Sequence, residues 1–435
     1  MPNSWISVIF MLCLFWHSSY GNVGKLVCYY DGASFVREGP AQLSLRELEI
    51  ALGFCNILVY GYAGIDAETF KLKSLNPQLT YNQDHYRHII ALKQKFPHVR
   101  FLLSVGGDRD LNSEGVVETE TYLRLLEEPE RRNSFKLSAI EELRKFGFDG
   151  LDLAWQFPKN KPKVERGAIK KAWHAFKGWF KNSSIDEKAE EHKEQFATLL
   201  RELAVQMQTN GILSLTMLPH VDASLFIDVA SVMNYVDFVN LGTYDFQTPE
   251  RNPKVADIPA PLYAMYDREP SFNLDYQVQY WINQTANAQK LHIGVATYAR
   301  AWLMSRDSGI TGYPPIPATE GAAPMGKQTG VPGLLSWPEV CELLQVPFNK
   351  DKAPLRKVGD PTKRFGIYAY HAAEDEGEKG IWVGYEDPTS AAIKAGYVHA
   401  KGLGGVALFD ISLDDFRGQC ADEKYPILRS IKYKL

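Results

Sequence analysis

The chain has 435 residues, of which 45% are hydrophobic and 12% aromatic, and its formal net charge is -4. This length and composition allow a large buried core. The slightly negative charge argues against a nucleic acid or another acidic polymer as its general partner. Length alone allows two or three domains, so the pattern of elements has to decide their number.

The first segment is an apolar run over residues 4–16, followed by small residues at Ser18, Ser19 and Gly21. The run is shorter than the about 20 apolar residues that cross a bilayer. It predicts a secretory signal peptide over residues 1–21, with an uncleaved membrane anchor as the alternative. No later stretch is apolar enough for a membrane span. We therefore expect a secreted, extracellular protein.

Eight short β-rich segments follow, most of them succeeded by a helical pattern. They are residues 25–30, 56–61, 99–105, 147–153, 212–218, 236–241, 291–297 and 405–409. Strands that alternate with helices predict a parallel sheet, and eight of them predict closure into a (β/α)₈ TIM barrel. A doubly wound open sheet is the alternative, but no Gly-x-Gly-x-x-Gly turn follows any of the segments.

The spacing is uneven at two places. More than a hundred residues separate the last two segments, and residues 368–370 and 380–385 within them have the aromatic and β-branched content of antiparallel strands. The second excess, residues 158–192, is strongly basic.

Between residues 159 and 181 of this insertion a single acid, Glu165, stands among eight basic residues, which are Lys159, Lys161, Lys163, Arg166, Lys170, Lys171, Lys177 and Lys181. Ile169, Trp173, Phe176 and Phe180 fall at helical spacing and predict a basic amphipathic helix. It either docks on the barrel with solvated lysines or binds a receptor, a heparan-like glycan or an anionic surface.

The fourth segment runs on into Phe-Asp-Gly-Leu-Asp-Leu-Ala-Trp-Gln-Phe-Pro, residues 148–158. Side chains alternate along a strand, so Asp152, Ala154 and Gln156 share one face. A barrel strand carries such an inward row to its C-terminal rim, where TIM-barrel enzymes place their chemistry. An ordinary barrel strand that happens to contain acids is the alternative.

This stretch resembles the signature of the family 18 glycoside hydrolases, the chitinases, which reads Asp-x-x-Asp-x-Asp-x-Glu. Asp149 and Asp152 match the first two acids, whereas Ala154 and Gln156 replace the last two. In that family the final Glu is the general acid, and the preceding Asp orients the substrate acetamide. An amide has no transferable proton near neutral pH, and losing positioned proton transfer costs ~10²- to 10⁴-fold in rate. The resemblance therefore implies a protein without catalytic activity.

Other positions of the sugar groove also resemble the family. Tyr244, Asp245 and Arg300 match residues that hold the sugar in active relatives, and Phe409 stands where those relatives have a stacking Trp. Gly242 replaces a usual Met. These matches make Tyr244, Asp245, Arg300 and Phe409 the candidate glycan-binding residues. The larger family members carry a small α+β domain before the last barrel strand, which implies such a domain at 301–385 and a barrel at 22–300 and 386–435.

The four cysteines after the signal peptide are Cys28, Cys55, Cys341 and Cys420. An even number in a secreted chain predicts two disulfides, with three connectivities open by count. Cys28 and Cys55 lie in or beside neighbouring strands and should pair. Cys341 with Cys420 then follows, as the resemblance also implies. No cofactor or metal is expected.

Three further features concern the surface. Asn182 and Asn283 begin N-glycosylation sequons. His85 and His88 fall three apart on an expected helix, which we interpret as surface residues and not as metal ligands.

The chain closely resembles the imaginal disc growth factors of insects in three features. These are Ala-Trp-Gln in the signature, the basic insertion, and the ending Gly-Gly-Val-Ala-Leu-Phe-Asp-Ile-Ser-Leu-Asp-Asp-Phe-Arg-Gly-Gln-Cys. This resemblance implies a secreted factor that promotes cell proliferation and motility with insulin-like signalling, through an unknown cell-surface receptor. One rival is a lectin that holds chitin or N-acetylglucosamine oligomers without cutting them. A hydrolase that uses Asp152 or Asp245 as proton donor is a third reading.

Overall fold

The computed structural model describes residues 24–161, 185–207, 211–345, 355–373, 375, 377–420 and 422–435. Three predictions fall wholly or mainly outside these residues: the signal peptide, the amphipathic helix of the basic insertion, and the sequon at Asn182.

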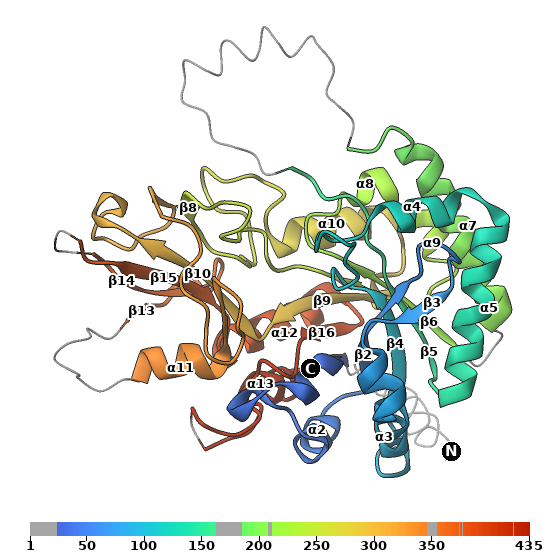
Figure 1. The fold of residues 1–435 in the computed structure, drawn as a ribbon. Helices are drawn as coiled ribbons and strands as arrows, with labels where there is room; N and C mark the ends of the chain where they lie inside the picture. The colour runs from blue at the N-terminus through green and yellow to red at the C-terminus, as the bar shows by residue number, and fades with distance from the viewer. Residues whose placement is uncertain are drawn as a thin grey trace, which may run out of the picture.

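Eight parallel strands form a closed barrel (Figure 1). The order around the barrel is β1-β16-β9-β7-β6-β5-β4-β2, and pairing of β1 with β2 closes it. This confirms the (β/α)₈ barrel and rules out the open sheet. The strands are β1 (Lys25–Asp31), β2 (Ile57–Ile65), β4 (Arg100–Gly106), β5 (Gly150–Ala154), β6 (Ile212–Met217), β7 (Phe238–Leu241), β9 (Leu291–Ala296) and β16 (Gly405–Phe409). A short β3 (Leu72–Ser74) pairs antiparallel with β2.

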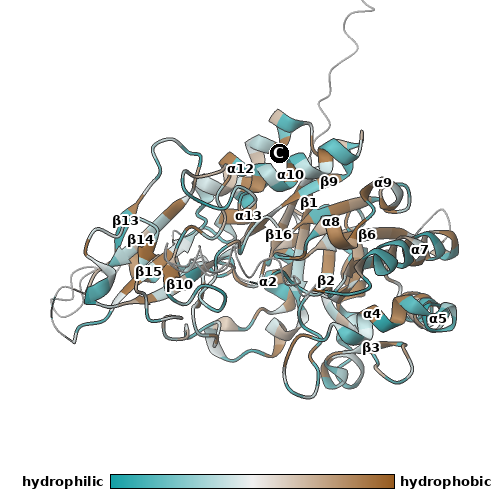
Figure 2. Cartoon of the chain, turned by 90° about the horizontal axis from the view of Figure 1, so that it is seen from above, coloured by the Kyte–Doolittle hydropathy of each residue, from teal (hydrophilic) through white to brown (hydrophobic). Residues whose placement is uncertain are grey.

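Helices cover the outside of the barrel. Figure 2 shows hydrophobic residues concentrated on the strands and hydrophilic residues along the outer helices α5 and α7. The helices are α2 (Leu45–Leu52), α3 (His85–Ala91), α4 (Glu120–Glu127), α5 (Pro129–Phe146), α7 (Ala189–Met207), α8 (Ala223–Phe226), α9 (Val229–Val232), α10 (Leu274–Gln284), α11 (Trp337–Gln345), α12 (Pro388–Lys401) and α13 (Pro426–Lys432).

Local sequence signals set the ends of several helices. Ser44 and Glu47 form a capping box that starts α2. Asp387 caps α12, and Pro388 occupies its first turn, where the missing N–H costs nothing. Gly147 ends α5 with φ 90°, a left-handed conformation that favours glycine.

The signature strand β5 is fixed by its outward face. Trp155, just beyond the strand, is buried with ring centroids 5.0 Å from Tyr122, 5.9 Å from Phe135 and 5.5 Å from Phe196. These partners belong to α4, α5 and α7. Burying an aromatic side chain of this size stabilises the fold by roughly 1.5–3 kcal/mol. The packing holds the polar face of the stretch toward the barrel mouth.

A second, antiparallel sheet lies between β9 and β16 in the chain. Its strand order is β12-β10-β15-β14-β13. Its bounds are β10 (Tyr298–Met304), β12 (Leu334–Ser336), β13 (Arg356–Val358), β14 (Ile367–His371) and β15 (Gly380–Tyr385). Residues 368–370 and 380–385 thus form antiparallel strands, as expected. The division into domains at 301 and 385 stays a prediction.

The second sheet has its own apolar cluster. Trp302 and Trp382 are fully buried within it, with ring centroids 5.6 Å apart. Ala256 and Ile258 also belong to this cluster, although they precede residue 301. A two-stranded pairing of β8 (Val255–Ala256) with β11 (Ile316–Pro317) brings them there.

Both disulfides are present in the structure. Cys28 on β1 is bonded to Cys55 before β2, with Cα atoms 6.0 Å apart. Cys341 on α11 is bonded to Cys420 near the C-terminus, with Cα atoms 5.7 Å apart. No helix among the described residues is long and apolar enough to cross a membrane.

Two surface expectations fare differently. Asn283 is exposed near the end of α10, where a sequon is accessible. His85, expected at the surface, is buried instead, with Nε2 3.1 Å from the Tyr30 hydroxyl. The expectation failed because α3 turns its first residue toward the barrel.

Candidate functional site at the barrel mouth

Asp152 lies on β5 in a shell of hydroxyl groups. Its carboxylate accepts hydrogen bonds from Ser104 (2.7 Å), Ser214 (2.6 Å) and Thr216 (2.9 Å), and from the Tyr29 hydroxyl at 3.4 Å. The residue is fully buried. Burial raises its pKa, and the hydrogen bonds from the hydroxyls only partly offset this effect. Side chains of the barrel itself therefore supply the hydrogen bonds that the Asp152 carboxylate accepts.

Asp149 lies at the other end of the strand. Its carboxylate accepts a hydrogen bond from the Phe101 backbone N–H at 2.8 Å. It also pairs with Lys93 at 2.8 Å and Arg100 at 3.5 Å. Asp149 precedes β5, so it lies at the N-terminal face of the barrel. Residues at this face of TIM barrels serve stability and not catalysis. The structure separates the two matching acids of the signature.

Ala154 ends β5 and is fully buried. Its carbonyl oxygen accepts a hydrogen bond from Gly107 at 2.9 Å. Gly106 has φ 96°, and a Cβ there would lie 2.3 Å from the same oxygen. The two glycines of the stretch Ser-Val-Gly-Gly, residues 104–107, thus allow the end of β4 to approach β5 closely. No carboxylate stands beside Asp152 at this position.

Gln156 follows directly and is also fully buried. Its Nε2 donates to the carbonyl oxygens of Asp110 at 3.0 Å and Glu118 at 2.5 Å. Its Oε1 accepts a hydrogen bond from the Asp110 backbone N–H at 3.2 Å. The amide therefore uses its donor and acceptor sides on the loop 108–118 between β4 and α4. We call this arrangement the amide clamp.

The loop 108–118 is also held from its other side. The Asp110 carboxylate accepts hydrogen bonds from the Ile65 backbone N–H at 2.9 Å and the Tyr122 hydroxyl at 3.2 Å. Lys73 lies 3.0 Å from its second oxygen. The loop is thus fixed to β2, β3 and α4 as well as to Gln156.

Tyr298, Asp245 and Arg300 form a network at the ends of β7 and β9. Arg300 donates two hydrogen bonds to the Asp245 carboxylate, at 2.8 and 2.6 Å, and the Tyr298 hydroxyl donates a third at 2.7 Å. Burial alone would raise the pKa of Asp245, but the charge and hydrogen bonds of Arg300 outweigh it and hold that pKa below its usual range. Asp245 is thus an ionised acceptor with no proton to donate near neutral pH.

Two aromatic residues line the mouth beside this network. The Phe409 ring stacks on Tyr29 with centroids 4.1 Å apart, and it lies 5.3 Å from the Tyr244 ring. Phe409 is partly exposed, whereas Tyr244 is buried. The structure therefore gathers Tyr244, Asp245, Arg300 and Phe409 at one rim.

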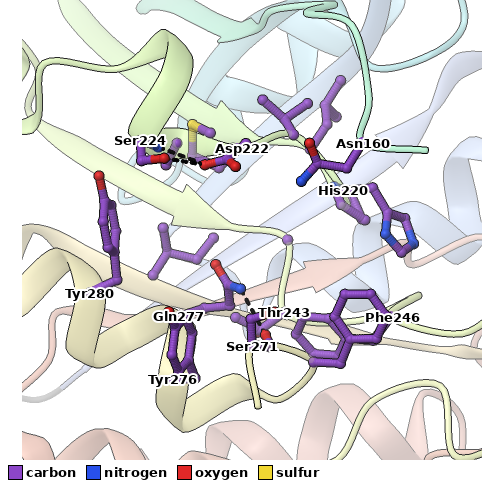
Figure 3. Close-up of a pocket in the computed structure, with 18 of the residues that line it drawn as sticks. Asn160, His220, Asp222, Ser224, Thr243, Phe246, Ser271, Tyr276, Gln277 and Tyr280 are labelled. Atoms are coloured by element: carbon purple, nitrogen blue, oxygen red, sulfur yellow. Dashed lines mark hydrogen bonds between the residues drawn. The ribbon is translucent and has the colours of Figure 1, made fainter. Parts of the chain in front are cut away.

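Two hollows adjoin this rim. The one among Tyr244, Asp245, Tyr298 and Arg300 has a volume of about 10 Å³, close to that of a single water site. The other, about 310 Å³, lies beside the ends of β6 and β7 and is lined by α8 and α10 (Figure 3). We call it the rim cavity.

Comparison with known proteins matches residues 25–414 to the family described as glycosyl hydrolases family 18. Chitinase-like protein Idgf5 of Drosophila melanogaster is 68% identical over 425 residues, 97% of this chain and 96% of that protein. Imaginal disk growth factor 6 of the same species is 54% identical over 420 residues, with 94% and 93% covered. The chain belongs to family 18, among the imaginal disc growth factors.

Solved structures agree with this assignment. Catalytic domain 2 of the Ostrinia furnacalis Group II chitinase is 28% identical, with a TM-score of 0.78 over 95% of this family 18 chain and 96% of the other. A mutant of the same domain in complex with penta-N-acetylchitooctaose gives a TM-score of 0.76, with 95% and 96% covered.

Sequence reasoning missed several residues of this family 18 site. Tyr29, Ser214 and Thr216 hold Asp152, and Tyr298 completes the network around Asp245. A signal for Ser214 and Thr216 was present, because both alternate inward on β6. The partners of Gln156 carry no such signal, since they are backbone atoms of a distant loop.

Proposed function

We propose that this family 18 protein is catalytically inactive and acts as a secreted growth factor. The observation that carries the first part is the amide clamp. At the position where the family signature has its general acid, Gln156 is buried and directs its N–H groups to two backbone carbonyls. It has no proton to transfer, and Ala154 supplies no charge partner beside Asp152.

The remaining acids do not replace it. Asp152 is fully buried among hydroxyl groups, and Asp245 is ionised by its pairing with Arg300. A general acid needs a proton and access to the glycosidic oxygen, and each of these residues lacks one of the two. This weighs against a hydrolase that uses either of them.

The growth factor role is supported by the relatives. One of them, 54% identical, is named imaginal disk growth factor 6. Secretion is supported by the short apolar run at residues 4–16 and by the two disulfides, which persist in oxidising compartments. We propose that the protein promotes proliferation and motility together with insulin-like signalling, through a receptor at the cell surface.

Two assays on one purified secreted sample test these parts separately. A fluorogenic chitotrioside measures hydrolysis, with an active family 18 chitinase as the positive control. We expect no turnover above buffer, and measurable turnover would refute inactivity. Cultured insect cells receive the protein with and without insulin. We expect higher cell numbers with both than with insulin alone, and equal numbers would refute the growth factor role.

A second function, binding of chitin-type oligosaccharides without cleavage, is favoured by the partly exposed Phe409 ring beside the Asp245–Arg300 network. An aromatic face and ionised hydrogen-bond partners suit a sugar ring. The related Ostrinia domain has been solved with penta-N-acetylchitooctaose.

Calorimetric titration with a chitin hexamer tests this second function. We expect saturable binding that weakens in Phe409→Ala. Phe54→Ala, a partly buried phenylalanine before β2, is the control that leaves the groove intact. Absence of heat exchange in the unmodified protein would exclude the lectin.

A further inference from the structure

The rim cavity lies beside the groove and shares Gly242 with it, but none of the four candidate glycan-binding residues. Neither the signature positions 149–156 nor Tyr244, Asp245, Arg300 or Phe409 line it. It opens between the end of β6, the end of β7, helix α8, the segment 269–272 and helix α10. Its volume of about 310 Å³ is at the lower end of the range found for small-molecule sites.

Aromatic rings form two of its sides. Figure 3 shows Tyr280 on one side and His220 with Phe246 on the other. Phe272 stacks against Phe246 with centroids 6.3 Å apart and an interplanar angle of 19°. Flat aromatic faces of this kind suit the C–H faces of a sugar ring as well as other planar or apolar groups.

Polar side chains enter the cavity between these rings. Figure 3 shows Asp222 and Asn160 above the hollow and Gln277 below it. Gln277 donates through Nε2 to the Ser271 carbonyl at 2.9 Å, and among the described residues its side-chain carbonyl oxygen accepts no hydrogen bond. One Asp222 oxygen caps α8 through Ser224. Acid and amide groups around one hollow offer hydrogen bonds to several hydroxyls at once.

The charged side chains that line the cavity, Asp222 and Glu269, are both acids and select against an anionic ligand. None of the described residues that line the cavity is Lys or Arg, so an anionic ligand lacks a counter-charge. His220 is neutral near pH 7, because burial, reinforced by the charge of Arg251, lowers its pKa to about 4. Its Nε2 is engaged with the Asp245 carbonyl.

We propose that the rim cavity is a second ligand site, which binds a single neutral pyranose such as a hexose or an N-acetylhexosamine. Tyr280 and Phe246 contact the ring faces, and Asp222, Asn160 and Gln277 bind its hydroxyls. The site uses none of the candidate glycan-binding residues of the groove, so this proposal and the proposed function can fail independently. The ligand proposed for the groove is a long oligomer, whereas the rim cavity has the size of one sugar unit.

Saturation-transfer NMR with N-acetylglucosamine and with glucose tests the site. We expect a Kd on the order of 1 mM for at least one of them, because a ligand as small as one sugar makes few contacts and binds weakly. Gln277→Met keeps the side-chain length but removes both hydrogen-bonding groups, and it should weaken binding about tenfold. Gln284→Met, the same change at an exposed position of the same helix, should leave binding unchanged.

Two more variants separate the cavity from the groove. Tyr280→Ala should weaken the monosaccharide signal, whereas Phe409→Ala should not. Thermal melting verifies that each variant folds. The proposal is overturned if neither sugar gives a signal at about twenty times the expected Kd. It is equally overturned if Phe409→Ala alone removes the signal, or if Gln277→Met and Tyr280→Ala both leave it intact.

Discussion

The amide side chain of Gln156 occupies the position of the general acid in the family signature. Glutamine is nearly isosteric with glutamate, so the change at position 156 preserves shape while it removes a titratable group. The structure adds a second effect. Two backbone carbonyls, of Asp110 and Glu118, face the side-chain nitrogen, and a carboxylate oxygen could not donate to either of them. The surroundings of residue 156 have become specific for an amide.

Gln156→Glu should therefore destabilise the protein without giving it chitinase-like activity. A carboxylate would face two carbonyl oxygens in a buried place, which costs roughly 1–3 kcal/mol. Denaturant unfolding measures the loss, and the fluorogenic chitotrioside measures activity. Gln94→Glu, at an exposed position, is the matched control and should change neither. A variant as stable as the unmodified protein would show that the amide clamp contributes nothing.

At the scale of elements, the periodicity of the sequence predicted the barrel but not the contacts between residues that lie far apart in the sequence. Every expected segment overlaps one barrel strand, because the alternation of strand and helix is a local property of the sequence. Four of the strands, β1, β2, β4 and β5, extend beyond the expected end. The contacts that build the site join distant positions, such as Gln156 with Asp110 and Tyr29 with Asp152. The family resemblance placed Asp245 and Arg300, but their mutual pairing came only from the fold. The rim cavity had no sequence signal at all, since five separate segments line it.

The Asp245–Arg300 pair joins the end of the barrel strand β7 to β10 of the second sheet. Asp245→Asn should lower the free energy of unfolding by about 3 kcal/mol, because it leaves a largely buried guanidinium with only the exposed Glu250, 3.6 Å away, as counter-charge. Glu49→Gln breaks an ion pair with Lys95, which is 62% exposed, and should cost less than about 1 kcal/mol. Chemical denaturation compares the two. Equal small losses would mean that the pair does not couple the sheets.

At the scale of the whole molecule, buried histidines should make the fold sensitive to acid. Burial lowers the pKa of His85 to about 4 and that of His292 to about 3, and His220 is lowered similarly. The unfolded chain binds protons at these residues with a pKa of about 6.5. Between about pH 6.5 and 4 the unfolded state therefore holds more protons, and stability falls as the pH falls.

Buried acids oppose this trend, because burial also raises the pKa of Asp152 and of Asp410. Burial raises the pKa of Asp414 to about 7, so below that pH the folded state holds a proton that the unfolded state lacks. We expect the three histidines to outweigh these acids, with a net loss of up to roughly 3 kcal/mol per pH unit from 6.5 toward 4.5. Urea unfolding at several pH values measures the slope, which His292→Gln should reduce. Greater stability at pH 4.5 than at 6.5 would contradict the expectation.

The bond between Cys341 and Cys420 has a consequence for proteolysis of the protein. It closes a covalent ring that holds β13, β14, β15, α12 and β16, and its two cysteines are 79 positions apart in the sequence. A protease that cuts once anywhere inside this ring cannot release a fragment, because both pieces stay tethered through the sulfur atoms. A nicked molecule keeps its last barrel strand in place. Release of a fragment from this region requires a second cut or reduction of the disulfide.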